Sequence, residues 1–294
     1  VFFCNSGTEA NEGAFKFARR AFGARPEKRE IVALKGAFHG RTMGALAATD
    51  RAAYREPFGP LVPGVQIVDP HDDAALERAV SAQRTAAVIA EPIQGEGGIN
   101  MLPSSLLQEL RALCDEADAA LILDEIQCGM GRTGSLFAYQ RAGVVPDMVT
   151  IAKAFGAGLP MGAILVNQRI ADALQPGDHG TTFGGGPFVA SVALAQFNLI
   201  SRPEFLRDVR RLGEWLERRL SELTARHATV KAVRGVGLIW GVELTEPVQP
   251  VIQRALERHL LLIAAGTHVI RLLPPLVISE EELQRGLAIL EECL

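Results

Sequence analysis

The sequence lacks long apolar runs, clustered cysteines and an excess of basic residues, and each absence excludes a class of protein. No apolar stretch approaches the roughly 18 uninterrupted residues that a membrane-spanning helix needs. The four cysteines are too scattered for a disulfide framework or a C-x-x-C metal site. We therefore expect a protein without a membrane partner or bound metal, in a reducing cytoplasm.

Charge of one sign is also not concentrated anywhere in the chain. The 30 Lys and Arg residues are interleaved with 34 Asp and Glu residues, which gives a formal net charge of −4. Nucleic-acid binding depends on clustered basic side chains, so we expect no nucleic-acid partner. The first residues contain no basic segment before an apolar one, and this pattern does not predict a secretion signal.

The 294 residues divide into two regions with different patterns. Residues 1–200 alternate short apolar runs with helical patterns, which predicts an α/β domain with a mostly parallel sheet flanked by helices. Residues 201–294 contain a long amphipathic helix, short strands and a last helix with capping-box spacing at Ser279 and Glu282. We expect this second region to form a smaller C-terminal α+β domain.

Polar residues follow the ends of four predicted strands. The apolar runs REIVAL, AAVIA, LIL and DMVTIA lead into KGAFHGRT, EPIQGEGG, DEIQ and KAFGAG, respectively. Open α/β sheets bind their ligands beyond the carboxyl ends of the strands. The sequence therefore predicts a binding site at this edge of the sheet.

The stretch LILDEIQCGMGRTG has the spacing G-x-G-x-x-G at Gly129, Gly131 and Gly134. In a dinucleotide-binding fold the first glycine follows the strand almost directly, whereas residues 124–128 intervene here. The strand ends instead at Asp124, whose carboxylate would repel a phosphate. A nicotinamide-dependent dehydrogenase is thus the weaker hypothesis. Asp124 needs a cationic partner, either an arginine in a structural ion pair or a protonated heterocycle.

Two further groups favour the heterocycle. Lys153 closes the next apolar strand, where desolvation would lower the pKa of its amine and make it nucleophilic, although a surface lysine is the alternative. The stretch SGTEANEG predicts a helix that begins near Gly7, either an ordinary capped helix or a phosphate site. A ring-nitrogen partner, an amine and a phosphate site are the three groups that pyridoxal phosphate requires.

Seven motifs, in order, resemble those of the class III (ornithine-type) aminotransferases, which are fold-type I pyridoxal-phosphate enzymes. They are NSGTEANE, AFHGRTMGALAAT, EPIQGEGG, LILDEIQCGMGRTG, IAKAFGAGLPMGA, HGTTFGG and RLLPPLVIS. The resemblance covers essentially the whole chain. Family members usually carry a further N-terminal segment, so we expect the given sequence to be truncated relative to the family and to lack part of its substrate pocket.

The resemblance implies roles for the residues around the cofactor. Lys153 would hold pyridoxal 5'-phosphate covalently and move a proton during catalysis, and Asp124 would keep the ring nitrogen protonated. Gln127 would bond to the ring hydroxyl, and Phe38 would stack on the ring face. The remaining cofactor residues would bind the phosphate; they are Gly7, Thr8 and Thr182.

The same resemblance implies a homodimer and a substrate site. Thr182 would reach the cofactor of the neighbouring subunit. Arg41 would bind the substrate's α-carboxylate, with Thr181 in an adjoining substrate-contact position. Glu96 and Arg271 would form a gate. In it, the Glu96 carboxylate would mask Arg271 when the amino donor binds and release it for 2-oxoglutarate.

The function implied is transfer of an amino group from N-acetylornithine, or a similar N-acylated ω-amino donor, to 2-oxoglutarate by a ping-pong mechanism through pyridoxamine phosphate. Several alternatives stay open. The donor could be ornithine, 4-aminobutyrate or a carrier-linked lysine precursor, and the chain could be an inactive truncated remnant.

Overall fold

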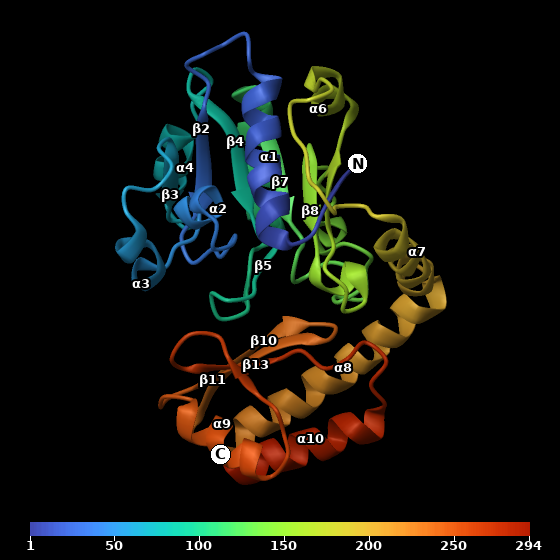
Figure 1. The fold of residues 1–294 in the computed structure, drawn as a ribbon. Coiled ribbons are helices and arrows are strands. Elements are labelled where there is room, and N and C mark those ends of the chain that lie inside the picture. Colours follow the sequence, from blue (N-terminus) through green and yellow to red (C-terminus); the bar gives the residue numbers. More distant parts are fainter.

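The computed structural model describes residues 1–294 and contains two main sheets with their helices (Figure 1). The larger sheet has seven strands in the order β1-β9-β8-β7-β4-β2-β3. Its strands are β1 (Phe2–Cys4), β2 (Glu30–Leu34), β3 (Val65–Val68), β4 (Thr85–Ala90), β7 (Ala120–Asp124), β8 (Met148–Ile151) and β9 (Gly162–Val166). Strands β3, β2, β4, β7 and β8 are parallel, whereas β9 and β1 are antiparallel to their neighbours. The predicted mostly parallel sheet is therefore confirmed.

Helices cover both faces of this sheet because its strands are apolar on both faces. In β2, Ile31 and Ala33 pack in a core with α1, whereas Val32 and Leu34 pack in a second core with α4 and α5. A two-stranded ribbon, β5 (Ile93–Gln94) and β6 (Asn100–Met101), extends below the sheet (Figure 1). The helices of this part are α1 (Gly7–Ala21), α2 (Met43–Ala47), α3 (Ala52–Arg55), α4 (Asp73–Ala79), α5 (Ser104–Glu116), α6 (Gln168–Ala173) and α7 (Pro187–Ile200), with 3₁₀ helices η1 (Glu56–Phe58), η2 (Ala138–Ala142) and η3 (Lys153–Gly156).

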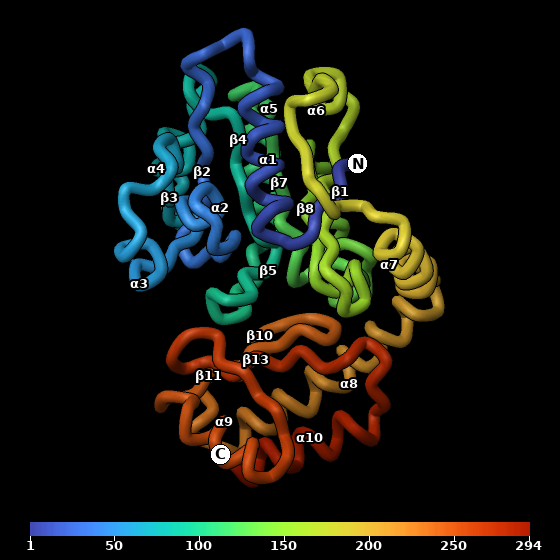
Figure 2. Tube along the Cα trace, viewed as in Figure 1, coloured from blue at the N-terminus to red at the C-terminus, as the bar shows by residue number.

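The C-terminal part has its own antiparallel sheet, in the order β10-β11-β13-β12. A separate core of leucines and valines joins this sheet to its helices, which lie beneath it in Figure 2. The domain boundary that we predict at residue 200 stays a prediction. Helix α7 ends at Ile200. The elements are α8 (Pro203–Arg226), β10 (Val230–Val236), β11 (Ile239–Leu244), α9 (Gln249–Glu257), β12 (Ile263–Ala264), β13 (Val269–Leu272) and α10 (Glu280–Cys293).

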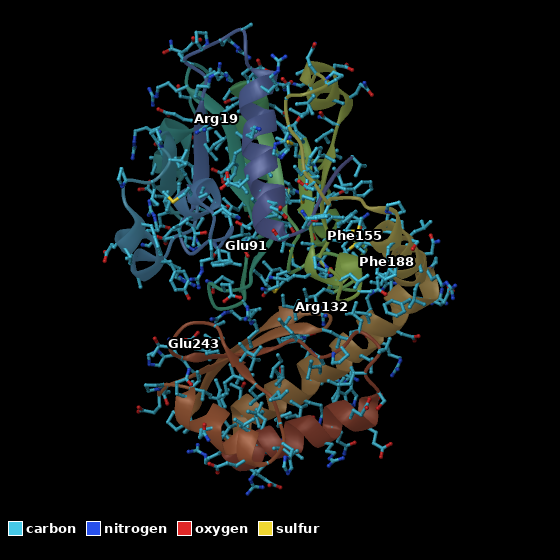
Figure 3. The ribbon with its side chains drawn as sticks, in the orientation of Figure 1. Arg19, Glu91, Arg132, Phe155, Phe188 and Glu243 are labelled. Atoms are coloured by element: carbon cyan, nitrogen blue, oxygen red, sulfur yellow. The ribbon has the colours of Figure 1, made fainter.

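The glycine-rich loop after β7 packs against the C-terminal part. Gly131 and Gly134 have φ of +83° and +81°, and a Cβ on Gly134 would lie 2.3 Å from Cγ of Arg210 in α8. Between them, Arg132 donates from Nη1 to the carbonyl oxygens of Leu238 (3.1 Å) and Pro274 (2.5 Å). Figure 3 shows Arg132 where the two parts meet. The glycines therefore permit close packing between the two parts of the chain.

None of the helices combines the length and the apolar character that crossing a membrane requires. The four cysteines are buried and unpaired with one another.

Candidate active site

A cavity of about 560 Å³ lies beyond the carboxyl ends of β4, β7 and β8. Figure 3 shows Glu91, one of its lining residues, at the edge of the large sheet that faces the C-terminal part. The structure brings eight of the predicted residues to this cavity, namely Gly7, Thr8, Phe38, Arg41, Glu96, Asp124, Gln127 and Lys153. Thr181, Thr182 and Arg271 do not line it.

Asp124 is buried at the end of β7 and is held by polar partners. Its Oδ2 accepts a hydrogen bond from Nδ2 of Asn11 and pairs with Nδ1 of His39, both at 2.8 Å. Its Oδ1 accepts from the backbone N–H of Ile126 at 3.0 Å. Because no arginine contacts this carboxylate, the structural ion pair with arginine is wrong. Asp124 borders the cavity with its charge unpaired by any permanent cation, which fits a protonated ring nitrogen.

Lys153 follows β8, the strand next to β7, and opens η3 with a φ of +47°. Its amine makes no hydrogen bond with another residue and borders the cavity. Although the side chain is open to the cavity, the surrounding protein desolvates the amine and lowers the pKa of Lys153, against the raising effect of Asp124 and Glu91. The lowered pKa that the sequence predicts for this lysine is thus confirmed in direction.

Helix α1 begins at Gly7, as predicted, with Ser6 as its N-cap. The first backbone bond of this turn is donated by Ala10 N to Ser6 O, so the N–H groups of Gly7 and Thr8 precede the helical ladder. The Thr8 hydroxyl lies 2.8 Å from that of Thr42, which ties the helix start to the neighbouring loop. Free N–H groups beside a cavity that also holds Lys153 and Asp124 fit the phosphate of pyridoxal phosphate.

Arg271 reaches the site from β13 in the C-terminal part. Its Nη1 donates to Oε1 of Glu96 and, at 3.1 Å, to Oε1 of Gln127. Burial would raise the pKa of Glu96, but the hydrogen bond and charge of Arg271 hold it below its usual value. The backbone carbonyl of Glu96 accepts from Nη2 of Arg51 at 2.5 Å. Both members of the predicted gate are therefore in contact.

Thr181 and Thr182 lie apart from the main cavity in this chain. They are exposed and line a second cavity of about 330 Å³. Thr181 is linked to the main site only through Asn5, whose Nδ2 donates to its hydroxyl oxygen at 3.2 Å. Within one chain, neither threonine reaches the pocket that contains Lys153.

Sequence reasoning missed Asn11 and the contact of His39 with Asp124. Asn11 lies on the buried face of α1, and an amide at a buried helical position was the signal that could have identified it. Nδ1 of His39 contacts Asp124 directly. Glu91 accepts the N–H groups of Phe38 (2.8 Å) and Gly95 (3.2 Å), so it orients the loops of the site. No group of three or more His, Cys, Asp or Glu side chains could hold a metal ion.

Comparisons with known proteins agree with this geometry. The profile of the family "Aminotransferase class-III" matches residues 1–294. The chain is 45% identical over 300 residues to the mitochondrial acetylornithine aminotransferase of Alnus glutinosa, with 100% of this chain and 66% of that protein covered. It is 46% identical over 297 residues to the acetylornithine aminotransferase of Clostridium acetobutylicum, with 100% and 76% covered.

A solved structure shows the same fold. The ornithine aminotransferase of Toxoplasma gondii, described with partial occupancy of pyridoxal phosphate at its active site, superposes with a TM-score of 0.93 and 32% sequence identity. The match covers 99% of this chain and 71% of that one. By fold, by motifs and by the match over its whole length, this chain belongs to the class III aminotransferases, which are pyridoxal-phosphate-dependent transaminases.

Proposed function

We propose that this protein transfers an amino group from N-acetylornithine, or a similar N-acylated ω-amino donor, to 2-oxoglutarate. The observation that carries the proposal is one cavity bordered by an unpaired amine of lowered pKa, a carboxylate without a permanent cation and an open helix start. The names of the two relatives support the donor. The chain spans 66% and 76% of their lengths, so its activity is inferred from its own residues together with those names.

The chain's own residues divide the cofactor chemistry among them. Bound pyridoxal phosphate supplies an electron sink for the C–H bond that breaks during transfer. The lowered pKa of Lys153 increases the neutral fraction of its amine. A neutral amine can condense with a carbonyl group with loss of water and, once released again, can take a proton from the substrate carbon. Asp124, fixed by Asn11 and His39, would hold a proton on the ring nitrogen, and the N–H groups that open α1 would bind the phosphate.

Two arginines would bind the carboxylates of the substrates. Arg41 borders the cavity without an ionic partner, so its guanidinium can form two parallel bonds to an α-carboxylate. Arg271 is neutralised by Glu96 in the structure, which suits a donor that has a single carboxylate for Arg41 to bind. Movement of Glu96 would expose Arg271 to the second carboxylate of 2-oxoglutarate. One cavity could thus accept two substrates of different charge.

A substrate series tests this proposal. Protein supplied with pyridoxal phosphate and 2-oxoglutarate is given N-acetylornithine, ornithine or 4-aminobutyrate, and glutamate formation is measured. We expect the highest kcat/KM with N-acetylornithine. A higher value with ornithine or 4-aminobutyrate would contradict N-acetylornithine as the donor. No glutamate above the level of Lys153→Ala with any donor would support the remnant hypothesis.

We also propose a homodimer in which Thr182 serves the neighbouring site. Phe183, Phe188 and Leu194, in and just before α7, are 79%, 72% and 61% exposed. Figure 3 shows Phe188, a residue of α7, at the edge of the molecule. A second copy covering this apolar face would place the adjacent Thr182 in an interface between subunits.

A cytoplasmic location stays a proposal, which cell fractionation would test.

A further inference from the structure

The guanidinium of Arg41 lies over an aromatic ring that is outside the cavity. Its Cζ is 3.5 Å from the ring centre of Tyr54 and 6.0 Å from that of Phe38. Arg41 lines the cavity and Tyr54 does not. No side chain or carbonyl oxygen of the chain accepts a hydrogen bond from this guanidinium. Tyr54 is therefore the nearer of the two aromatic contacts of this guanidinium, and it leaves the N–H groups available.

This arrangement matters because Arg41 is exposed on a loop. A long side chain without a partner samples many rotamers, and fixing it costs conformational entropy when a ligand binds. An acidic partner would fix it but would compete with the carboxylate of a substrate. An aromatic ring attracts the cation through its π face and occupies none of the donors.

Tyr54 is itself held in place from the side of the cofactor cavity. It belongs to α3, and its ring meets that of Phe38 edge to face, with centroids 6.4 Å apart and an interplanar angle of 83°. Phe38 is in turn fixed by the bond from its N–H to Glu91. The position of Arg41 is thus coupled through Tyr54 to the loop that contains Phe38 and borders the cavity.

We propose that Tyr54 is a positioning residue that orients Arg41 and thereby sets the preference for substrates with an α-carboxylate. This inference rests on the proposed function, in which Arg41 binds that carboxylate. Loss of the aromatic ring should weaken ligands that carry the α-carboxylate. Ligands of the same shape without this group should be unaffected.

A pair of matched donors tests the inference. N-acetylputrescine has the chain and amine of N-acetylornithine but lacks the carboxylate. For Tyr54→Met we expect the KM of N-acetylornithine to rise by roughly 5- to 30-fold, the range that corresponds to a cation–π contact of about 1–2 kcal/mol. For N-acetylputrescine, both kcat and KM should stay unchanged. Tyr54→Phe keeps the ring and should match the unaltered protein.

Turnover of N-acetylputrescine also reports whether Tyr54→Met is folded. An equal loss with both donors, or no change with N-acetylornithine, would overturn the inference. In a double-variant cycle, Arg41→Met should remove the effect of Tyr54→Met, because the ring acts through this arginine. Additive losses in the two variants would also overturn it.

Binding gives a readout that does not depend on turnover. N-acetylnorvaline carries the α-carboxylate but no transferable amine, and its affinity for the cofactor-loaded protein can be measured by calorimetry. We expect weaker binding to Tyr54→Met and to Arg41→Met than to the unaltered protein. Weakening by Arg41→Met alone would overturn the role of Tyr54 and leave the proposed function intact. No binding to the unaltered protein would overturn the proposed carboxylate site, and this inference with it.

Discussion

At the residue scale, the site combines buried carboxyl groups that have different surroundings. Asp124 receives hydrogen bonds from Asn11 and from a backbone N–H and pairs with His39, and it borders the cavity. Glu125, the next residue, points into the protein, where it accepts the N–H groups of Ala138 (2.9 Å) and Tyr139 (2.8 Å). Of these two adjacent residues, one therefore borders the cavity and the other holds the scaffold behind it.

The burial of Glu125 makes stability depend on pH. Burial raises the pKa of its carboxyl group to about 7, from an ordinary value of 4.5. Between these values the folded state binds more protons than the unfolded state, so the free energy of unfolding falls as pH rises through this range. Over the whole range, such a shift lowers the free energy of unfolding by about 3 kcal/mol. Burial also raises the pKa of Glu91 to about 7, which acts in the same direction.

Glu125→Gln removes this titration and isolates its effect. We expect the stability lost by Glu125→Gln, relative to the unaltered protein, to be larger at pH 5 than at pH 8. At pH 5 the native carboxyl is neutral, whereas at pH 8 the unaltered protein must bury a charge. Urea unfolding of both proteins at the two pH values measures the difference. A stability loss that does not change with pH would contradict the assigned pKa.

At the scale of elements, the start of α1 and the loop before α2 depend on one close contact. Gly40 has a φ of +136°, and a Cβ there would lie 2.3 Å from the hydroxyl oxygen of Thr8. We expect Gly40→Ala to lower the free energy of unfolding by about 1–3 kcal/mol and to weaken pyridoxal phosphate binding, because Thr8 must move. Urea unfolding of the apoprotein and a cofactor titration measure the two effects.

Gly286 provides the matched control for Gly40. It lies within α10, and a Cβ there would meet only Cδ1 of Leu260, at an ordinary 3.7 Å. The same change, Gly286→Ala, should raise stability by roughly 0.5–1 kcal/mol because alanine favours the helix. Equal losses in both variants would contradict the assigned clash at Gly40.

The elements around the site could be predicted from sequence, but several of their contacts could not. Apolar runs that end in polar residues identified β4, β7 and β8, and the pairing of Ser6 with Glu9 located the start of α1. The contacts of Asn11 with Asp124 and of Tyr54 with Arg41 join residues that no local pattern connects. The roles of the site residues stay predictions, although eight of them border one cavity.

At the scale of the whole molecule, the position of Thr182 predicts a site shared between subunits. Lys153→Ala should be inactive because it lacks the amine, and Thr182→Ala should be weakened because it would lose the proposed phosphate contact. In a mixed dimer, one site would combine Lys153 of one subunit with Thr182 of the other. We therefore expect activity to rise when the two variants are unfolded together and refolded as a mixture.

The mixing experiment has a clear contrary result. If the mixture is no more active than the average of the separate variants, Thr182 does not serve the neighbouring site. Light scattering on the unaltered protein and on Phe188→Asp checks the assembly itself, since a charge on the exposed face of α7 should favour the monomer.

The most direct test of the central claim is the visible absorption spectrum of the protein with added pyridoxal phosphate, recorded before and after N-acetylornithine. We predict a visible band that is absent in Lys153→Ala, fades with the donor and returns with 2-oxoglutarate. A colourless protein, or a spectrum indistinguishable from that of Lys153→Ala, would contradict the claim that Lys153 and its neighbours form a working transaminase site.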